Sequence, residues 1–312
     1  MRKILLSVTA AALLFGIATP AQAVSSSKQD IEVLWNAKKI SFPDAKPFQD
    51  GSDRVMVPIR FVSEALGAKV GWTKSGSKLS VSIQNNEHTV NMTVGQKTAT
   101  IDGQTKTYDT QIVLKQNRTF VPLRLVSEGL GQPVEWDKLS RWVWIGAKEV
   151  PTLEESGLKP VNLDPYRKWF AKKQYLLESP RGDKKYNQAL IFKISDLPTS
   201  FQRDIYSVEL YTDPKTTNIY LKVRSKTTSS AGNLFLLTKK SDIRYRYPID
   251  QRTINNGDGT KYSFYSVWSS SDKIIDGIVD QKPLTIKDIE YIGFRGSEQD
   301  YIPLLINPWK GN

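Results

Sequence analysis

The sequence predicts an α+β domain made of two β-rich units, each with one short helix, followed by a mainly-β domain that forms a sandwich or a jelly roll. A block at 57–72 returns at 121–136. Short runs of alternating apolar and polar residues surround both copies, as strands with one buried face require. Beyond a proline-rich stretch, further runs of strand length are separated by turn residues, which is typical of an all-β domain.

The repeated block reads VPIRFVSEALGAKVGW in its first copy and VPLRLVSEGLGQPVEW in its second. Pro58 suits the first turn of a helix, because its φ is already helical and its missing N–H has no partner there. Ile59, Val62 and Leu66 then share one face, and Gly67 stands where a left-handed cap ends a helix. Such a short helix is stable only when packed against its sheet. The repeat signature is Pro58, Arg60, Glu64, Gly67, Trp72, Pro122, Arg124, Glu128, Gly131 and Trp136.

Strand-length runs flank each copy. Residues 31–42 contain two alternating runs around Asn36-Ala37, which predict a hairpin, and residues 88–108 contain a second set of strands. The alternating segments at 79–83 and 141–145 close the two copies. The same order of elements therefore occurs twice, as expected when one structural unit is repeated.

Proline and acidic residues without a hydrophobic period mark 147–164 as a linker. It separates a first domain at 31–146 from a second at 165–306. A helix beginning at Asp164 is expected to open the second domain, although a strand beginning near Gln174 could replace its second half. Further strands are expected at 189–194, 205–211, 218–225, 234–238, 243–249, 261–268, 285–294 and 301–306.

Residues 1–23 have the features of an export signal. Arg2 and Lys3 precede an apolar run that ends near Ile17, and Ala21-Gln22-Ala23 resembles a cleavage site. The run is too short to span a membrane. We expect a secreted protein, either free or associated with the cell wall. The final segment, LLINPWKGN, has neither a hydrophobic tail nor a basic stop, so covalent wall anchoring is not expected.

Composition narrows the chemistry further. Cysteine is absent, which excludes disulfides, thiolate metal sites and a cysteine nucleophile. The formal net charge is +12 and is spread over both halves. Such a distribution favours loose attraction to polyanions such as wall polymers over a dedicated nucleic-acid groove. A basic surface that only confers solubility is the alternative.

The doubled motif V-P-[IL]-R-x-[VL]-S-E-x-L-G-x-x-V-x-W resembles the copper amine oxidase N-terminal-like domain, or stalk domain, over about residues 31–146. The resemblance implies an α+β accessory module of secreted and wall-associated proteins in Gram-positive bacteria, without bound copper. Copper amine oxidases bind their metal through several histidines, whereas this chain has one, His88. No amine oxidase activity, cofactor or metal is therefore expected.

Candidate reactive residues have simpler structural explanations. Arg60 with Glu64, and Arg124 with Glu128, stand at i, i+4 on the short helices, where an exposed pair contributes only about 0.3–0.5 kcal/mol. We expect these arginines instead to reach carbonyls or a carboxylate of the neighbouring unit. His88 as a general base, Arg181-Gly182-Asp183 as an adhesion motif and Asn255–Gly259 as a calcium loop all lack supporting residues. No catalytic residue is assigned.

The strand RWVWI places Trp142 and Trp144 where the first copy has Ser80 and Ser82. Val143 and Ile145 alternate with them and are expected to point into the core, so both tryptophans point outward. An apolar patch of this size needs a cover. Three alternatives remain for what covers the rings: the second domain, a glycan stacked on the rings, or an oligomer contact.

The function expected is a non-catalytic scaffold and binding protein of the bacterial cell envelope. The repeated domain acts as a spacer, and the β-rich domain, with Tyr245, Tyr247, Tyr262 and Tyr265 among arginines, binds wall polymer or polysaccharide. These tyrosines also fit strands with one face in the core. Two alternatives remain: an extracellular polysaccharide hydrolase with its site in the second domain, and a structural or spore-surface component.

Overall fold

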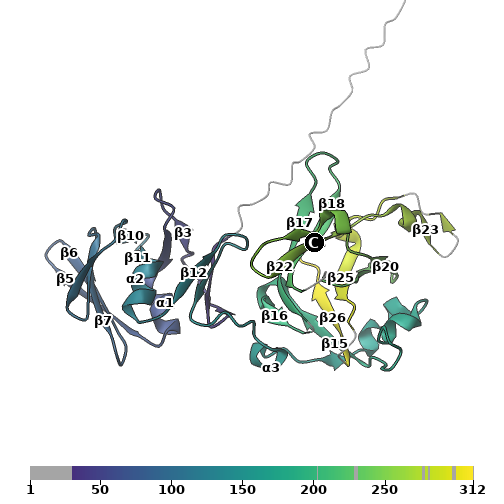
Figure 1. Cartoon of the computed structure of the whole chain (residues 1–312), viewed down its shortest axis with the longest axis horizontal. Coiled ribbons are helices and arrows are strands. Elements are labelled where there is room, and N and C mark those ends of the chain that lie inside the picture. Colours follow the sequence, from purple (N-terminus) through teal and green to yellow (C-terminus); the bar gives the residue numbers. More distant parts are fainter. Residues whose placement is uncertain are drawn as a thin grey trace, which may run out of the picture.

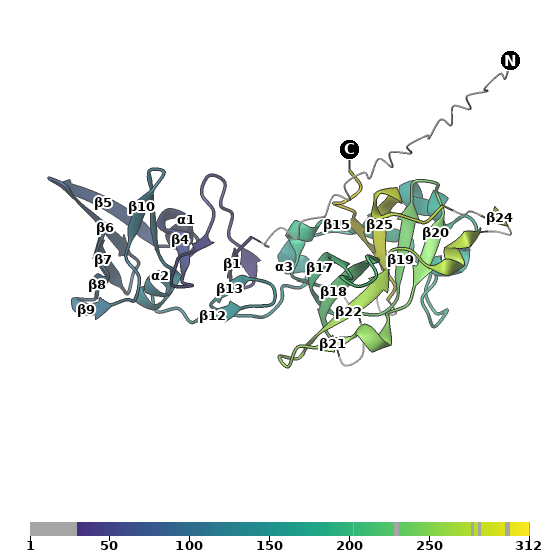
Figure 2. The ribbon, with the colours of Figure 1, turned by 90° about the horizontal axis from the view of Figure 1, so that it is seen from above.

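The computed structural model describes residues 30–201, 203–227, 231–275, 278–279, 282–296 and 300–311. The export signal expected at 1–23 lies outside these residues. Figure 1 shows two domains side by side along the long axis, the N-terminal one in purple and teal, the other in green and yellow. Strands β1, β12 and β13 lie at the end of the N-terminal domain that faces the second domain (Figure 2).

The two copies of the repeat meet at the centre of the N-terminal domain. Strand β4 (Val55–Pro58) pairs antiparallel with β11 (Arg118–Pro122), and Val57 lies opposite Val121, the first residue of the other copy. This pairing of equivalent residues gives the domain a local twofold relation. The helices α1 (Ile59–Ala65) and α2 (Leu123–Gly129) follow these strands and contact each other.

The sequence correctly predicts how the helices begin and end. Pro58 and Pro122 precede the first helical residues. Gly67 and Gly131 have φ of 73° and 72°, a conformation that glycine adopts without the steric cost of a side chain. At Gly131 a Cβ would also come within 2.8 Å of Nε2 of His88. Both glycines are therefore needed at the helix ends.

The sequence pattern predicts two β-rich units, one for each copy of the repeat. In the structure these units are not separate, because each flanking sheet combines strands of both copies. Strand β1 of the first copy pairs parallel with β13 of the second, and β6 of the first pairs with β7 of the second. Apolar residues of both copies form one core. The sheets are β12 (Val134–Asp137), β13 (Trp142–Ile145), β1 (Glu32–Trp35) and β2 (Lys38–Lys39); β10 (Val113–Lys115), β11, β4 and β3 (Phe48–Gln49); and β5 (Lys69–Ser75), β6 (Lys78–Gln84), β7 (Thr89–Thr93), β8 (Thr98–Ile101) and β9 (Gln104–Thr107).

The linker is shorter than the expected 147–164. Helix α3 (Leu153–Ser156) begins with a capping box between Thr152 and Glu155, and Thr152 bridges to Ser200 of the second domain. Strand β14 (Val161–Asn162) pairs with the sheet of that domain. Leu153 and Leu158 pack against the core of that domain, so this segment belongs to the second domain and not to the linker. About residues 147–150 remain as the connection.

The second domain is a sandwich of two sheets, which confirms the predicted mainly-β class. Each expected strand of this domain is present, with its ends shifted by a few residues. Side chains of both sheets interdigitate in one buried cluster. The first sheet is β14, β15 (Gln188–Phe192), β26 (Tyr301–Ile306), β25 (Ile289–Phe294), β19 (Leu234–Thr238) and β20 (Ile243–Arg246); the second is β16 (Thr199–Ser200), β17 (Asp204–Thr212), β18 (Ile219–Lys226), β22 (Thr260–Ser266) and β21 (Ile254–Asn255); β23 (Ile274–Ile275) and β24 (Ile278–Val279) form a separate hairpin.

A helix begins at Asp164 as expected, but it is a 3₁₀ helix. The segment forms two 3₁₀ helices, η1 (Asp164–Phe170) and η2 (Gln174–Leu177). Trp169, Phe170 and Leu176 pack on the outer face of the first sheet, so close packing against the sheet sets the local geometry. Shorter 3₁₀ turns occur at η3 (Ile194–Asp196), η4 (Asp250–Arg252), η5 (Ser270–Lys273) and η6 (Ile286–Asp288). Among the described residues, no helix is long and apolar enough to cross a membrane.

Candidate functional site

Trp142 and Trp144 are buried on the outward face of β13, with only 3% and 4% of each residue exposed. Val143 and Ile145, on the alternate positions, lie in the core of the N-terminal domain. Leu34 of β1 lies opposite Trp144 and belongs to the same cluster as the two tryptophans. The alternation in the sequence therefore identifies the correct face of the strand.

The second domain covers these rings. Tyr206 of β17 packs edge-on against Trp144, with ring centroids 6.3 Å apart, and Trp144 lies 5.7 Å from Trp142. On the other side, Nζ of Lys39 lies 5.2 Å from the Trp142 ring centre, close enough for a cation–π contact. The structure thus places the two tryptophans in the domain interface. Their faces are not available to stack on a sugar.

Arg224 of β18 holds the same interface by polar contacts. Its side chain is 3% exposed, and Nη1 donates to carboxylate Oδ2 of Asp137 and, at 2.6 Å, to Oγ of Ser140, both in the N-terminal domain. Nη2 donates to Asp258 at 2.7 Å. The guanidinium also lies 5.0 Å from the Tyr206 ring centre. A planar fork with several donors can satisfy partners from both domains at once.

Tyr206 makes the interface sensitive to alkali. Burial, and then the nearby charge of Asp204, raise the pKa of the phenol from 10.0 to about 12. Below pH 10 the group is neutral in both states; between pH 10 and 12 mainly the unfolded chain loses this proton, so the free energy of unfolding falls as pH rises. We expect Tyr206→Phe to lose less stability than wild type between pH 9 and 11.5 in urea unfolding. Equal losses of stability in the variant and in wild type would contradict this prediction, because all the other tyrosines are common to both proteins.

The charged residues of the repeat do not reach across to the neighbouring unit, contrary to expectation. Nε of Arg124 lies 3.4 Å from Oε1 of Glu128 in an exposed i, i+4 pair. Arg60 lies over the ring of Trp72, 5.0 Å from its centre. These charged residues occupy the exposed positions of helices whose other faces are buried, so their side chains extend along the surface of their own copy. Such contacts contribute little to stability.

Three tyrosines and an arginine form a row on the second domain, in which Tyr175 and Tyr247 are exposed and Tyr245 and Arg295 are half-buried. Tyr247, just after the edge strand β20, is 69% exposed, and Tyr175 in η2 is 56% exposed. The Arg295 guanidinium lies 5.9 Å from the Tyr175 ring centre and 5.8 Å from that of Tyr245. Tyr245 in turn packs edge-on against Tyr247, with centroids 5.0 Å apart. We call these four residues the tyrosine surface. Tyr262 and Tyr265 are buried instead.

Comparison with protein families decides what the N-terminal domain is. Residues 34–145 match the family described as copper amine oxidase N-terminal domain. These residues form a copper amine oxidase N-terminal domain. The match ends at the last residue of β13. No curated protein matches the chain.

The copper amine oxidase N-terminal domain carries a groove of about 950 Å³ along its second copy. The signature residues Arg124, Glu128 and Trp136 line it together with Tyr108. The hydroxyl of Tyr108 is buried without a hydrogen-bond partner among the described residues. Acidic and basic side chains balance along the groove, so it has no preference for a polyanion. The lining charges are Asp53, Arg54, Lys106, Asp109, Arg124 and Glu128.

His88 and the two short motifs have structural roles. Nδ1 of His88 lies 2.8 Å from Oδ2 of Asp102, which ties β7 to β8 within the copper amine oxidase N-terminal domain. Asp183 of the Arg-Gly-Asp tripeptide accepts a hydrogen bond from the Ser179 hydroxyl. Asp258, in the turn before β22, binds Arg224 and the amide of Thr260. In the described part of the chain, no three histidines or carboxylates gather as a metal site would require.

The sequence gives no indication of Arg224 and Arg295 as contact residues. In NIYLKVRS, Arg224 lies in a strand whose alternate residues are apolar, and a buried arginine looks the same as an exposed one until its partners are known. Tyr175 lies in the segment expected to be a helix or strand. The grouping of Tyr245 and Tyr247 with arginine in IRYRYPI is the one signal that points to this surface.

Proposed function

We propose that the chain is an exported, non-catalytic scaffold and binding protein of the bacterial cell envelope. In this proposal the copper amine oxidase N-terminal domain serves as the spacer. The β-sandwich binds an anionic wall polysaccharide through the tyrosine surface. The observation that carries the proposal is the exposure of Tyr175, which lies against Arg295, and of Tyr247, which packs against Tyr245.

The chemistry of the tyrosine surface suits a sugar chain. Phenol rings offer flat apolar faces with a hydroxyl at the end. A tyrosine side chain has only two torsions, so fixing it on binding costs little conformational entropy. Arg295 adds a charge that can pair with a phosphate or carboxylate on the polymer. The net charge of +12 adds long-range attraction to a polyanion.

The buried interface supports the role of a spacer. Tyr206 and Arg224 fix the second domain on the sheet that carries Trp142 and Trp144. Interdomain interfaces are often polar and mobile, whereas this one buries aromatic rings and an ion pair. The short connection at about residues 147–150 further limits how far the two domains can move relative to each other. A spacer with this construction presents its binding surface in one orientation.

The hydrolase alternative receives less support from the carboxylates. Glycoside hydrolysis needs a carboxylic acid with a raised pKa close to a second carboxylate. Among the described residues of the second domain, the buried Asp213 and Asp272 both pair with arginines. Hydrogen bonds from the amide of Lys215 and from Arg252 lower the pKa of Asp213. A structural or spore-surface role differs in location, and cell fractionation would separate it from a wall-binding role.

The test is sedimentation of the full-length mature protein with purified cell wall. We expect Tyr175→Ala/Tyr247→Ala to weaken binding by at least about 30-fold, the equivalent of about 2 kcal/mol for the loss of aromatic anchors. Far-UV circular dichroism of the variant should match wild type, because both rings are exposed. Reducing ends are measured in the same samples, and their release by wild type would favour the hydrolase.

The matched control is Trp72→Ala, which removes a 41% exposed aromatic ring from the other domain. Wall binding of this variant should equal that of wild type. If Trp72→Ala weakens binding and the tyrosine variant does not, the binding surface lies on the copper amine oxidase N-terminal domain and the proposal fails.

A further inference from the structure

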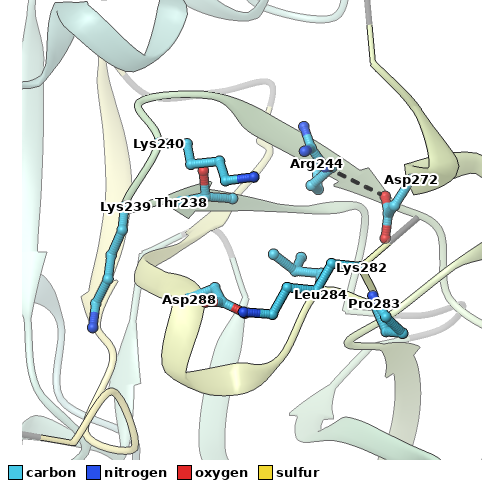
Figure 3. Close-up of a pocket in the computed structure, with 9 residues that line it drawn as sticks. All are labelled: Thr238, Lys239, Lys240, Arg244, Asp272, Lys282, Pro283, Leu284 and Asp288. Carbon is cyan, nitrogen blue, oxygen red and sulfur yellow. Dashed lines mark ion pairs between the residues drawn. The ribbon is translucent and has the colours of Figure 1, made fainter. Parts of the chain in front are cut away.

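A small cavity on the other face of strand β20 has a basic lining. It holds about 70 Å³ and is bounded by β20, the turn after β19, and the segment that leads into η6 (Figure 3). Four basic and two acidic side chains line it, so the lining carries an excess of positive charge. The lining residues are Thr238, Lys239, Lys240, Arg244, Asp272, Lys282, Pro283, Leu284 and Asp288.

Arg244 is the central residue of the cavity. It is 8% exposed, and Nε is buried without a hydrogen-bond acceptor among the described residues. Nη2 pairs with Oδ2 of Asp242 at 2.9 Å, but Nε lies 3.6 Å from Oδ1 of Asp272, too far for a hydrogen bond. An unsatisfied donor on a buried guanidinium is costly, and an acceptor inside the cavity would remove that cost.

Asp272 lies too far away to be that acceptor, and other donors already bind both of its oxygens. Nη1 of Arg246 donates to Oδ1 at 3.1 Å and Nη2 to Oδ2 at 2.5 Å, and the amide of Ser269 donates to Oδ2 at 2.9 Å. Two arginines thus share one buried carboxylate. Asp288 is likewise held by the amide and hydroxyl of Thr285. The acidic groups of the lining therefore have their own partners and leave the positive charge of Arg244 partly unmatched.

We propose that this cavity binds one phosphate-type oxyanion, with Nε of Arg244 donating to it. Figure 3 shows the amine of Lys240 directed toward the same space as Arg244, whereas Lys239 points away. Arginine is suited to phosphate by its fixed donor geometry, and lysine adds a point charge. The volume has room for a few waters, hence for one tetrahedral anion but not for a sugar ring. The site is separate from the tyrosine surface and does not depend on it.

The experiment is isothermal titration of the full-length mature protein with inorganic phosphate, at constant ionic strength in chloride. Arg244→Lys keeps the charge but removes Nε, so we expect phosphate binding to weaken about tenfold or more. Lys240→Met should weaken it by a smaller factor and provides a second variant if the first one folds poorly. The matched control is Lys74→Met, an exposed lysine of β5 in the other domain, which should bind as wild type does.

A second arm distinguishes two sources of the anion. Glycerol phosphate and a short poly(glycerol phosphate) chain are titrated under the same conditions. Competition by the chain at an equal phosphate concentration would assign the cavity to phosphodiesters of a polymer, and binding of inorganic phosphate alone would assign it to the free ion. Absence of any phosphate binding to wild type, or equal binding by Arg244→Lys and wild type, would overturn the proposal. Loss of wall binding in the tyrosine variant would leave this titration unchanged.

Discussion

Trp142→Ala/Trp144→Ala is expected to uncouple the two domains. Truncation of a buried tryptophan costs about 3–5 kcal/mol, and here both rings lie between the sheet of β13 and Tyr206. Calorimetry should show two separated unfolding transitions at lower temperature than wild type. Limited proteolysis should cut near residues 147–150 faster, because the connection is no longer held between packed domains.

The same variant decides what the tryptophans do. Wall binding should remain close to that of wild type, since the tyrosine surface is untouched. Trp72→Ala is the matched control, and its unfolding temperature should change less, because 41% of this residue is exposed. If the double variant keeps its stability and loses wall binding, the rings bind polymer in solution and the interface described here is not the functional arrangement.

Much of the fold follows from local patterns in the sequence. Pro58 and Gly67 bound the first helix because each restricts or permits particular backbone angles, and these preferences act without distant contacts. Strands such as 89–93 alternate between a buried and a more accessible face, and Asn36-Ala37 takes the positive φ values of a tight hairpin turn. Features of this kind are visible in one stretch of sequence.

Pairings between distant strands could not be predicted in this way. Nothing in IEVLW indicates that β1 pairs in parallel with β13, because the pairing depends on how the two copies fold around each other. The repeat suggests two separate units, yet burying both helices in one core removes more apolar surface from water. The linker predicted from the sequence is too long for the same reason: Leu153 and Leu158 look isolated until the sandwich they contact is known.

The candidate sites show the same division. Two outward-facing tryptophans next to a linker predict that some other group covers their rings, since exposed rings of that size are unfavourable. Which residues provide the cover is a property of the assembled molecule: Tyr206 and Arg224 are distant in sequence from β13. The cavity at Arg244 needs three separate segments to converge, and a single strand reading IRYR cannot reveal it.

Arg224→Met is expected to be about as destabilising as the truncation of one buried tryptophan. It removes the donor to Asp137 and Ser140 across the interface and to Asp258 and Thr260 within the sandwich. Removing one partner of a buried ion pair typically costs about 3–5 kcal/mol of stability, much of it because the remaining charge has lost its partner. Urea unfolding monitored by tryptophan fluorescence would measure the loss.

A double-mutant cycle separates the interface contact from the rest. Asp137→Asn in the Arg224→Met background should recover part of the lost stability, since the unpaired carboxylate is then neutral. Arg118→Met is the matched control: its pair with Asp44 is exposed, so we expect a cost within about 1 kcal/mol that disappears at high salt. The cost of Arg224→Met should persist at 1 M salt, because the pair is shielded from solvent. A cost below about 1 kcal/mol, or one that salt removes, would mean that water reaches Arg224 and that the domains are not held together at this point.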